Sequence, residues 1–231
     1  MTGKDYIIVN GVSSHEIDLY IDTPPMPPLQ APLFETITIA GRAEQLTFNQ
    51  VSREDIQIDI SAYMFDDTAY NPTALYNYLA NAQTLQTSKS ADYVYRVSRL
   101  LNVVPSYRGH GKQFLQISFM CSPFRYSVSD TTYQTNKKEF FISNTGSFYA
   151  QPVYRLNGTG TLTLEVNDDS DNKLIIPNVK DFCIVDAEKL LVHKDNVIMT
   201  SKGQIPFMAV GSNKVVTNAD SIEILMNTRW L

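Results

Sequence analysis

The chain is poor in the residues on which metal sites and disulfide frameworks depend. Its 231 residues include two cysteines, three histidines and one tryptophan. Cys121 and Cys183 stand far apart, without a C-x-x-C pattern or a nearby pair of histidines, which excludes the common zinc motifs. We therefore expect two free, buried thiols, as is usual in a reducing cytosol.

Basic charge and long apolar runs are also scarce. The chain has 19 Lys and Arg against 24 Asp and Glu, a net charge of -5, so it lacks the basic surface that non-specific phosphate binding needs. No stretch approaches the roughly 20 apolar residues of a membrane span, and the N-terminus has no apolar core of a signal peptide. We expect no nucleic-acid recognition, no membrane insertion, and a protein that stays where it is made.

A polar seam near the middle divides the sequence. Residues 114–126 begin as an alternating strand and turn continuously apolar, and we expect Pro123 to end that strand because it has no backbone donor. Residues 127–138 are polar and rich in Ser and Thr. This pattern predicts two domains, residues 1–130 and 131–231.

The first half has mainly β signals and one helix. Asn10-Gly11 predicts a hairpin turn, with residues 12–21 as the returning strand, and residues 35–40 and 45–49 flank a turn at Gly41-Arg42. Asn71 can cap a helix over residues 73–81, with Pro72 in its first turn. Leu75 and Leu79 share one face of this helix, which would cover a sheet. Further strands are expected at residues 56–60, 93–98, 100–105 and 113–121.

The second half consists of short apolar stretches separated by closely spaced turns, a pattern typical of a β-sandwich. The expected strands are residues 138–144, 153–156, 161–166, 174–176, 182–186, 190–193, 197–199 and 222–226.

Catalytic and metal-binding patterns are absent from the sequence. His15, His110 and His193 have no nucleophile and acid in local register. The acidic residues 167–171 resemble the start of a calcium loop, but Asn172 replaces the required glycine. We expect no catalytic residue, no metal and no cofactor.

The order of motifs along the chain resembles the distal tail (Dit) proteins of siphophages. The motifs are the helix at residues 72–79, Tyr93 and Tyr95, QISFMCSPFRY, NTGSFYAQPVYRLNGTG, FCIVD, GQIPFMAVGSN and the final MNTR. No one of them is diagnostic, but together they span nearly the whole chain. The resemblance implies an N-terminal β domain with one helix and a long hairpin, which assembles into a hexameric ring, and a C-terminal galectin-like β-sandwich outside it.

The resemblance also implies a function and partners. Such a ring is a structural hub at the end of the tail tube in the virion, assembled in the host cytoplasm. It contacts the tail tube protein, a tail tip or tail-associated protein, and receptor-binding or baseplate proteins. This chain has no room for the inserted carbohydrate-binding module of larger relatives, so host recognition would rest with other tail proteins.

Two alternatives stay open. The first is a carbohydrate-binding adhesin, although galectins use His, Asn and Arg at adjacent strand positions with a stacking Trp. Here His193 is followed by Lys194, Asp195 and Asn196 at a different spacing, and Trp230 lies at the end of the sequence. The second alternative is a cell-wall hydrolase, for which the sequence offers no active site.

Aromatic residues favour assembly. Thirteen Tyr and eleven Phe supply rigid contact area of the kind that interfaces use. For the ring we predict subunit contacts in the N-terminal domain, at Phe34 and Phe48 of the hairpin and at Leu75 and Leu79 of the helix. Charges introduced there are expected to leave folded monomers that cannot form rings.

Overall fold

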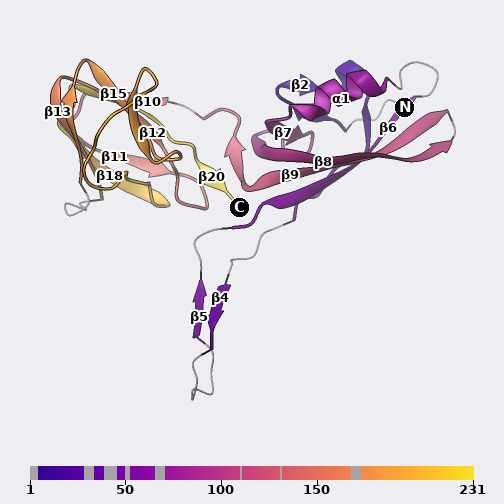
Figure 1. Ribbon diagram of the computed structural model, residues 1–231, viewed down its shortest axis with the longest axis horizontal. Helices are drawn as coiled ribbons and strands as arrows, with labels where there is room; N and C mark the ends of the chain where they lie inside the picture. The colour runs from indigo at the N-terminus through magenta and orange to yellow at the C-terminus, as the bar shows by residue number, and fades with distance from the viewer. Residues whose placement is uncertain are drawn as a thin grey trace. The chain divides into compact units, whose positions relative to one another are not determined.

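The computed structural model describes residues 5–28, 34–38, 46–49, 53–65, 71–109, 111–130, 132–167 and 173–231. As the sequence predicts, the fold is mainly β, with one α-helix and one short 3-10 helix among these residues. The chain divides into two compact units (Figure 1): unit 1 comprises residues 1–128 and Leu231, and unit 2 comprises residues 129–230. The polar seam of the sequence lies beside this division.

One antiparallel sheet organises unit 1. Its strand order is β2 (Val12–Ser13), β1 (Ile7–Val9), β7 (Thr84–Thr87), β8 (Tyr93–Gly109), β9 (Lys112–Ser127), β6 (Ile56–Phe65) and β3 (Tyr20–Thr23). The long β8 and β9 form a hairpin whose turn contains Gly111 at a φ of 69°. Strand β6 pairs with β9 along its whole length, from Ile56 opposite Cys121 to Phe65 opposite Lys112.

The predicted hairpin at the start of the chain is confirmed, but its returning strand is short. Asn10 and Gly11 have φ values of 51° and 83°, as a tight hairpin turn between β1 and β2 requires. Strand β2 then gives way to the 3-10 helix η1 (Ser14–Ile17), so the prediction of one strand over residues 12–21 is wrong. The cause is a capping box, in which Ser13 accepts a hydrogen bond from His15 N and donates its own N–H to Glu16.

The predicted helix is confirmed as α1 (Pro72–Ala80). The Asn71 side chain accepts hydrogen bonds from the N–H groups of Thr73 and Ala74, both at 3.1 Å, and Pro72 occupies the first turn. Leu75 and Leu79 are buried in the same core as the inward residues of β6 and β9. The helix therefore covers one face of the sheet, as expected.

Two expectations about the strands of unit 1 are wrong. Strand β9 continues through Pro123 to Ser127, and β8 is one strand rather than two. The register places Val97 opposite Cys121 and Tyr95 opposite Arg125, so Pro123 lies in an irregularity where the ladder does not need its N–H.

The predicted hairpin near Phe34 and Phe48 is a small sheet of its own. Strands β4 (Phe34–Ile37) and β5 (Leu46–Asn49) pair antiparallel, with Phe34 opposite Asn49 and Glu35 opposite Phe48 (Figure 1). The expected turn at Gly41 and Arg42 lies outside the described residues.

Unit 2 is a sandwich of two sheets. The six-stranded sheet has the order β10 (Thr132–Thr135), β19 (Ser221–Leu225), β12 (Val153–Asn157), β15 (Phe182–Asp186), β16 (Leu191–Lys194) and β17 (Val197–Ile198). The four-stranded sheet has the order β11 (Glu139–Asn144), β18 (Gly211–Thr217), β13 (Gly160–Val166) and β14 (Leu174–Val179). The short strand β20 (Arg229–Trp230), near the end of the sequence, is not part of this sheet. The core contains inward residues of both sheets, among them Tyr154, Leu156, Leu164, Ile176, Val215 and Ile222.

Candidate functional site

The structure separates the four predicted interface residues into two groups. Phe34 and Phe48 lie on the paired strands β4 and β5, and their side chains are outside the described part of the molecule. Leu75 and Leu79 are 3% and 0% exposed, inside the core of unit 1. A charge at either leucine is therefore expected to unfold unit 1 rather than leave a folded monomer. The role of all four residues in a subunit contact stays a prediction.

A neighbouring aromatic residue on the same helix is exposed. Tyr76 is 65% accessible, although it directly follows Leu75. It lines a hollow of about 180 Å³ together with Pro72, Leu75 and Val103 of β8. The apolar spacing along the helix marks the buried face with Leu75 and Leu79, so this pattern does not indicate Tyr76. The exposed surface of the helix next to that face therefore carries an aromatic side chain.

The second face of the unit 1 sheet is polar over part of its area. Gln57, Asp59 and Gln116 are exposed on adjacent strands. The Asp59 carboxylate accepts hydrogen bonds from Gln57 Nε2, at 2.9 Å, and from the hydroxyl of Ser118, while Gln116 Nε2 donates to the hydroxyl of Ser61 at 2.9 Å. The bonds made by Ser118 and Gln116 link β9 to β6, and the bond from Gln57 to Asp59 lies within β6. Unit 1 thus has an apolar face covered by its helix and a second face that is partly polar.

An aromatic cluster occupies one end of that second face. The rings of Tyr20 and Tyr63 stack with centroids 5.6 Å apart, Phe65 and Phe114 lie 5.6 and 5.9 Å from Tyr63, and the Lys112 ammonium lies 3.8 Å from the Tyr63 centroid. Tyr63 is only 6% exposed, so its ring packs mainly within the unit. The cluster stabilises the end of the sheet more than it offers a contact surface.

The outer edge of β8 is open along its second half. Strand β7 pairs with β8 only at Tyr95 and Arg96, and from residue 98 onward the described residues place only β9 beside it. Val104 is 48% exposed on this stretch, but Pro105 has no N–H and the register is interrupted by bulges. Such features protect an edge from added strands.

Reactive side chains are few in the described part of the molecule. Cys121 and Cys183 are both fully buried and unpaired in disulfides. Burial, with a smaller effect from Asp55, raises the pKa of Cys121 to about 12, and burial raises the pKa of Cys183 to about 11. Both thiols are therefore protonated at neutral pH and poor nucleophiles.

The two histidines in the described residues lie on different elements. The His15 ring lies 5.6 Å from that of Tyr6 and 5.4 Å from that of Tyr20, and His193 lies on β16 opposite Ile184. His110 and the acidic residues Asp169 and Asp171 lie outside the described residues. Within the described ranges, His, Cys, Asp and Glu form no group of three or more that could hold a metal, and no helix could span a membrane.

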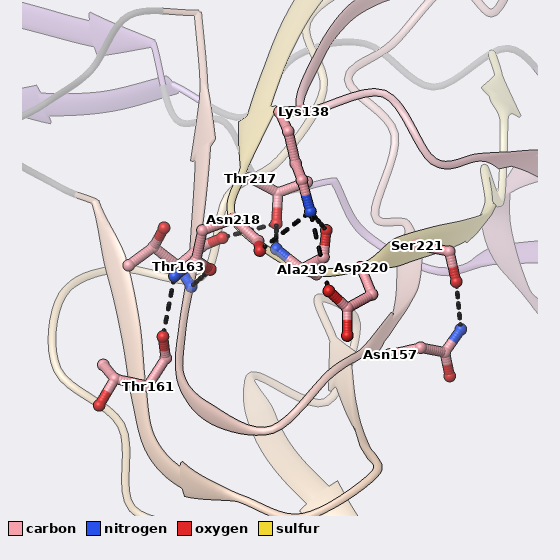
Figure 2. Close-up of polar contacts among 9 residues, drawn as sticks. All are labelled: Lys138, Asn157, Thr161, Thr163, Thr217, Asn218, Ala219, Asp220 and Ser221. Atoms are coloured by element: carbon pink, nitrogen blue, oxygen red, sulfur yellow. Dashed lines mark hydrogen bonds and ion pairs between the residues drawn. The ribbon is translucent and has the colours of Figure 1, made fainter.

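A dense polar cluster lies where β18 turns into β19 (Figure 2). Asn218 accepts a hydrogen bond from Thr163 N at 2.8 Å and donates one to the carbonyl oxygen of Thr161 at 2.9 Å, and the Thr217 hydroxyl donates to the carbonyl oxygen of Thr163 at 2.7 Å. The Lys138 ammonium donates to the carbonyl oxygen of Asn218 at 3.3 Å. These groups form hydrogen bonds with one another and with the backbone. The cluster therefore stabilises a corner of the sandwich and does not form a binding site.

Comparison with known proteins identifies a shared fold. No protein-family model and no curated protein sequence matches the chain. Among solved structures, it is similar to the crystal structure of the SPP1 Dit protein, described as a paradigm of the hub adsorption apparatus in phages that infect Gram-positive bacteria. The TM-score is 0.76, the sequence identity is 13%, and the match covers 98% of this chain and 99% of the SPP1 chain. The resemblance inferred from the order of sequence motifs is thus confirmed at the level of the fold.

Proposed function

We propose that this protein is a structural hub of a phage tail, in which copies of the chain form a ring, with six copies expected. The observation that carries the proposal is the chain-wide likeness to a hub adsorption protein. Because the match covers both units and nearly all of both chains, it supports a role for the whole molecule and not only for one common β module.

The surfaces of unit 1 support assembly through this unit. It has a single main sheet, the exposed Tyr76 on helix α1 and an open stretch of β8. An exposed aromatic beside a shallow hollow is typical of the anchors that interfaces use. Head-to-tail contacts that close on themselves produce rings, so one such contact per copy is sufficient.

The proposal places the protein at the distal end of the tail, after assembly in the host cytoplasm. Its neighbours there would be the tail tube protein on one side and tail tip, receptor-binding or baseplate proteins on the other. The proposed role is structural and not enzymatic. The protonated, buried state of both cysteines supports this view, because it removes the two strongest potential nucleophiles of the chain.

Native mass spectrometry of the full chain tests the ring, and negative-stain imaging tests its closure. We expect a single species with the mass of six chains and a round projection with a central opening. A chain that stays monomeric over a concentration series contradicts a ring that forms by itself. A dimer with two-fold symmetry contradicts the head-to-tail arrangement.

Antibody labelling of intact virions tests the location independently of ring formation in solution. Label confined to the distal tip of the tail is the expected result. Label on the capsid or along the tail tube contradicts the hub proposal, even if rings form in solution.

A further inference from the structure

An apolar patch lies on the outer face of the six-stranded sheet, where a sandwich normally shows polar side chains. Val153, Ile184 and Leu225 are partly exposed there, on the neighbouring strands β12, β15 and β19. Val153 stands opposite Leu225, and the next outward position of β12, Arg155, stands opposite Ile184. Three aliphatic side chains from separate parts of the sequence therefore form one outward-facing floor.

Polar groups border this floor and define a hollow. The hollow has a volume of about 160 Å³ and is lined by Thr132, Val153, Arg155, Ile184, Glu223 and Leu225. Arg155 and Glu223 are directly opposite in the register of β12 and β19. Although they are cross-strand neighbours of opposite charge, no ion pair joins them among the described residues. A guanidinium and a carboxylate thus line the same hollow, and each keeps bonding capacity.

The arginine is held in place by contacts away from the hollow. Its guanidinium carbon lies 4.1 Å from the centroid of the Phe182 ring, and its Nε donates to Asn157 Oδ1 at 3.2 Å. Asn157 in turn donates to the Ser221 hydroxyl at 3.0 Å (Figure 2). These contacts fix the side chain, and among the described residues they occupy one of the five N–H donors of Arg155. A fixed guanidinium with free donors is pre-organised to receive a ligand.

The chemistry of the lining selects the class of ligand. An anion would meet Glu223, a cation would meet Arg155, and a purely apolar molecule would bury both charges without partners, which is costly. A neutral ligand with an apolar face and several hydroxyl groups satisfies all the lining groups, because hydroxyls both donate to a carboxylate and accept from a guanidinium. Since β12 is paired on both sides, an extended peptide cannot add to it as a strand.

We propose that this hollow, the Arg155–Glu223 slot, binds one sugar ring of a neutral saccharide. The ring would lay its C–H face on Val153, Ile184 and Leu225 and direct hydroxyls to Arg155 and Glu223. A hub with such a slot would itself contact glycans, in addition to carrying other tail proteins. The inference stands on unit 2 alone and does not depend on ring formation.

Methyl NMR of the full chain, labelled at Ile, Leu and Val, tests the proposal because the floor of the slot consists of these residues. The probes are D-glucose, D-galactose, N-acetyl-D-glucosamine and L-rhamnose, each titrated into the millimolar range where weak single-ring ligands saturate. We expect at least one sugar to shift the methyl signals of Val153, Ile184 and Leu225 saturably. Ile175 is 37% exposed on the other sheet and should not move.

Two glutamate variants test the named contacts. Glu223→Gln removes the charge and keeps the shape, and we expect it to weaken sugar binding about tenfold, since hydrogen bonds to charged groups are the stronger ones. The matched control is Glu139→Gln on the other sheet, whose carboxylate is paired with Lys214 at 3.2 Å, and its sugar affinity should equal that of the unmodified chain.

Three results would overturn the proposal. They are no shift with any of the four sugars, shifts that include Ile175 equally, and unchanged affinity in a folded Glu223→Gln variant. If tetra-alanine shifts the slot methyls and no sugar does, the slot is a peptide site and the saccharide assignment is wrong.

Discussion

The two units bury the apolar faces of their sheets in different ways. In unit 2 each sheet covers the inner face of the other, so the apolar side of both is enclosed. In unit 1 the main sheet has α1 and its own loops on one face and polar, hydrogen-bonded side chains on the other. Unit 2 thus buries the inner faces of both its sheets, whereas unit 1 leaves part of one face of its main sheet without a covering layer. If copies of the chain form the proposed ring, this contrast predicts that they meet through unit 1.

The largest expected effects come from breaking each core separately. Tyr154 in unit 2 is fully buried, with its hydroxyl donating to the carbonyl oxygen of Pro206 at 3.1 Å, and Phe119 in unit 1 is fully buried as well. We expect Tyr154→Ala and Phe119→Ala each to lower the free energy of unfolding by about 3–5 kcal/mol. Each unit contains one buried thiol, so the rate of reaction with a thiol reagent reports on each core.

The pattern of thiol exposure decides whether the units are independent. Tyr154→Ala should expose Cys183 while Cys121 stays protected, and Phe119→Ala should do the reverse. Tyr154→Phe is the mild control, since it removes one hydrogen bond worth about 1 kcal/mol. If both thiols react together in both variants, the chain unfolds as one cooperative body and the comparison of separate cores fails.

The next effect concerns assembly, and it rests on the proposed ring. Tyr76 in unit 1 and Phe141 in unit 2 are 65% and 66% exposed, so they are matched in accessibility and differ in the unit that carries them. We expect Tyr76→Glu to weaken ring formation at least tenfold in native mass spectrometry, because truncated or charged aromatic anchors commonly cost 2 kcal/mol or more. Phe141→Glu should leave the rings intact.

This experiment tests two claims separately, that the chain forms a ring and that unit 1 provides the subunit contacts. If the unmodified chain forms no ring, the assembly proposal fails before either variant is compared. If rings form and only Phe141→Glu disrupts them, the subunit contacts come from unit 2 and the contrast between the units is reversed. Circular dichroism of both variants shows whether each remains folded.

The sequence predicted elements whose signals are local. The helix at Pro72–Ala80 follows from Asn71 and Pro72, and the first hairpin follows from Asn10 and Gly11, because caps and turns act over a few residues. Strand β18 was missed because its inward residues include Asn213 and Thr217, which hide the alternation of apolar and polar residues. Asn213 is fully buried and bonds Ala209 through both side-chain atoms, at 2.8 Å each. No periodicity search identifies a buried position that is occupied by an amide.

The sequence could not reveal the slot for a different reason. The galectin pattern depends on spacing along one strand, and in this sequence it concerns His193 and the residues after it. The slot residues Arg155, Ile184 and Glu223 belong to three strands, and only the register brings them together. Cross-strand neighbours depend on sheet order, which a single sequence does not specify. The same limit applies to Leu75 and Leu79, whose apolar spacing fits a core and an interface equally well.

A smaller effect tests the corner of the sandwich shown in Figure 2. Asn218→Ala removes the bonds to Thr163 N and to the carbonyl oxygen of Thr161, and we expect a loss of about 2 kcal/mol at about 1 kcal/mol per bond. Faster reaction of Cys183, with Cys121 unchanged, would assign the loss to unit 2. Thr159→Ala, in an exposed turn of the same unit, is the control and should have no effect. An equal loss in both variants contradicts a specific role for Asn218.

The smallest effect depends on pH and again belongs to unit 2. Asp186 is almost fully buried, and burial alone would raise the pKa of its carboxyl group. The N–H groups of Lys189 and Glu188 and the Lys189 ammonium have a larger, opposite effect. The pKa is therefore lowered below its ordinary value of 3.8. A lowered pKa in the folded state stabilises the protein above the ordinary value, and this stabilisation is lost as the pH falls through the lowered one. Asp186→Asn keeps the acceptor and removes the charge, so urea unfolding should show a loss of under about 1 kcal/mol at neutral pH that vanishes in acid. The control is Asp181→Asn, at an exposed pair with Lys194, and we expect it to leave the free energy of unfolding unchanged at both pH values. If the loss for Asp186→Asn persists in acid, the charge of the carboxylate does not stabilise this turn and the prediction is wrong.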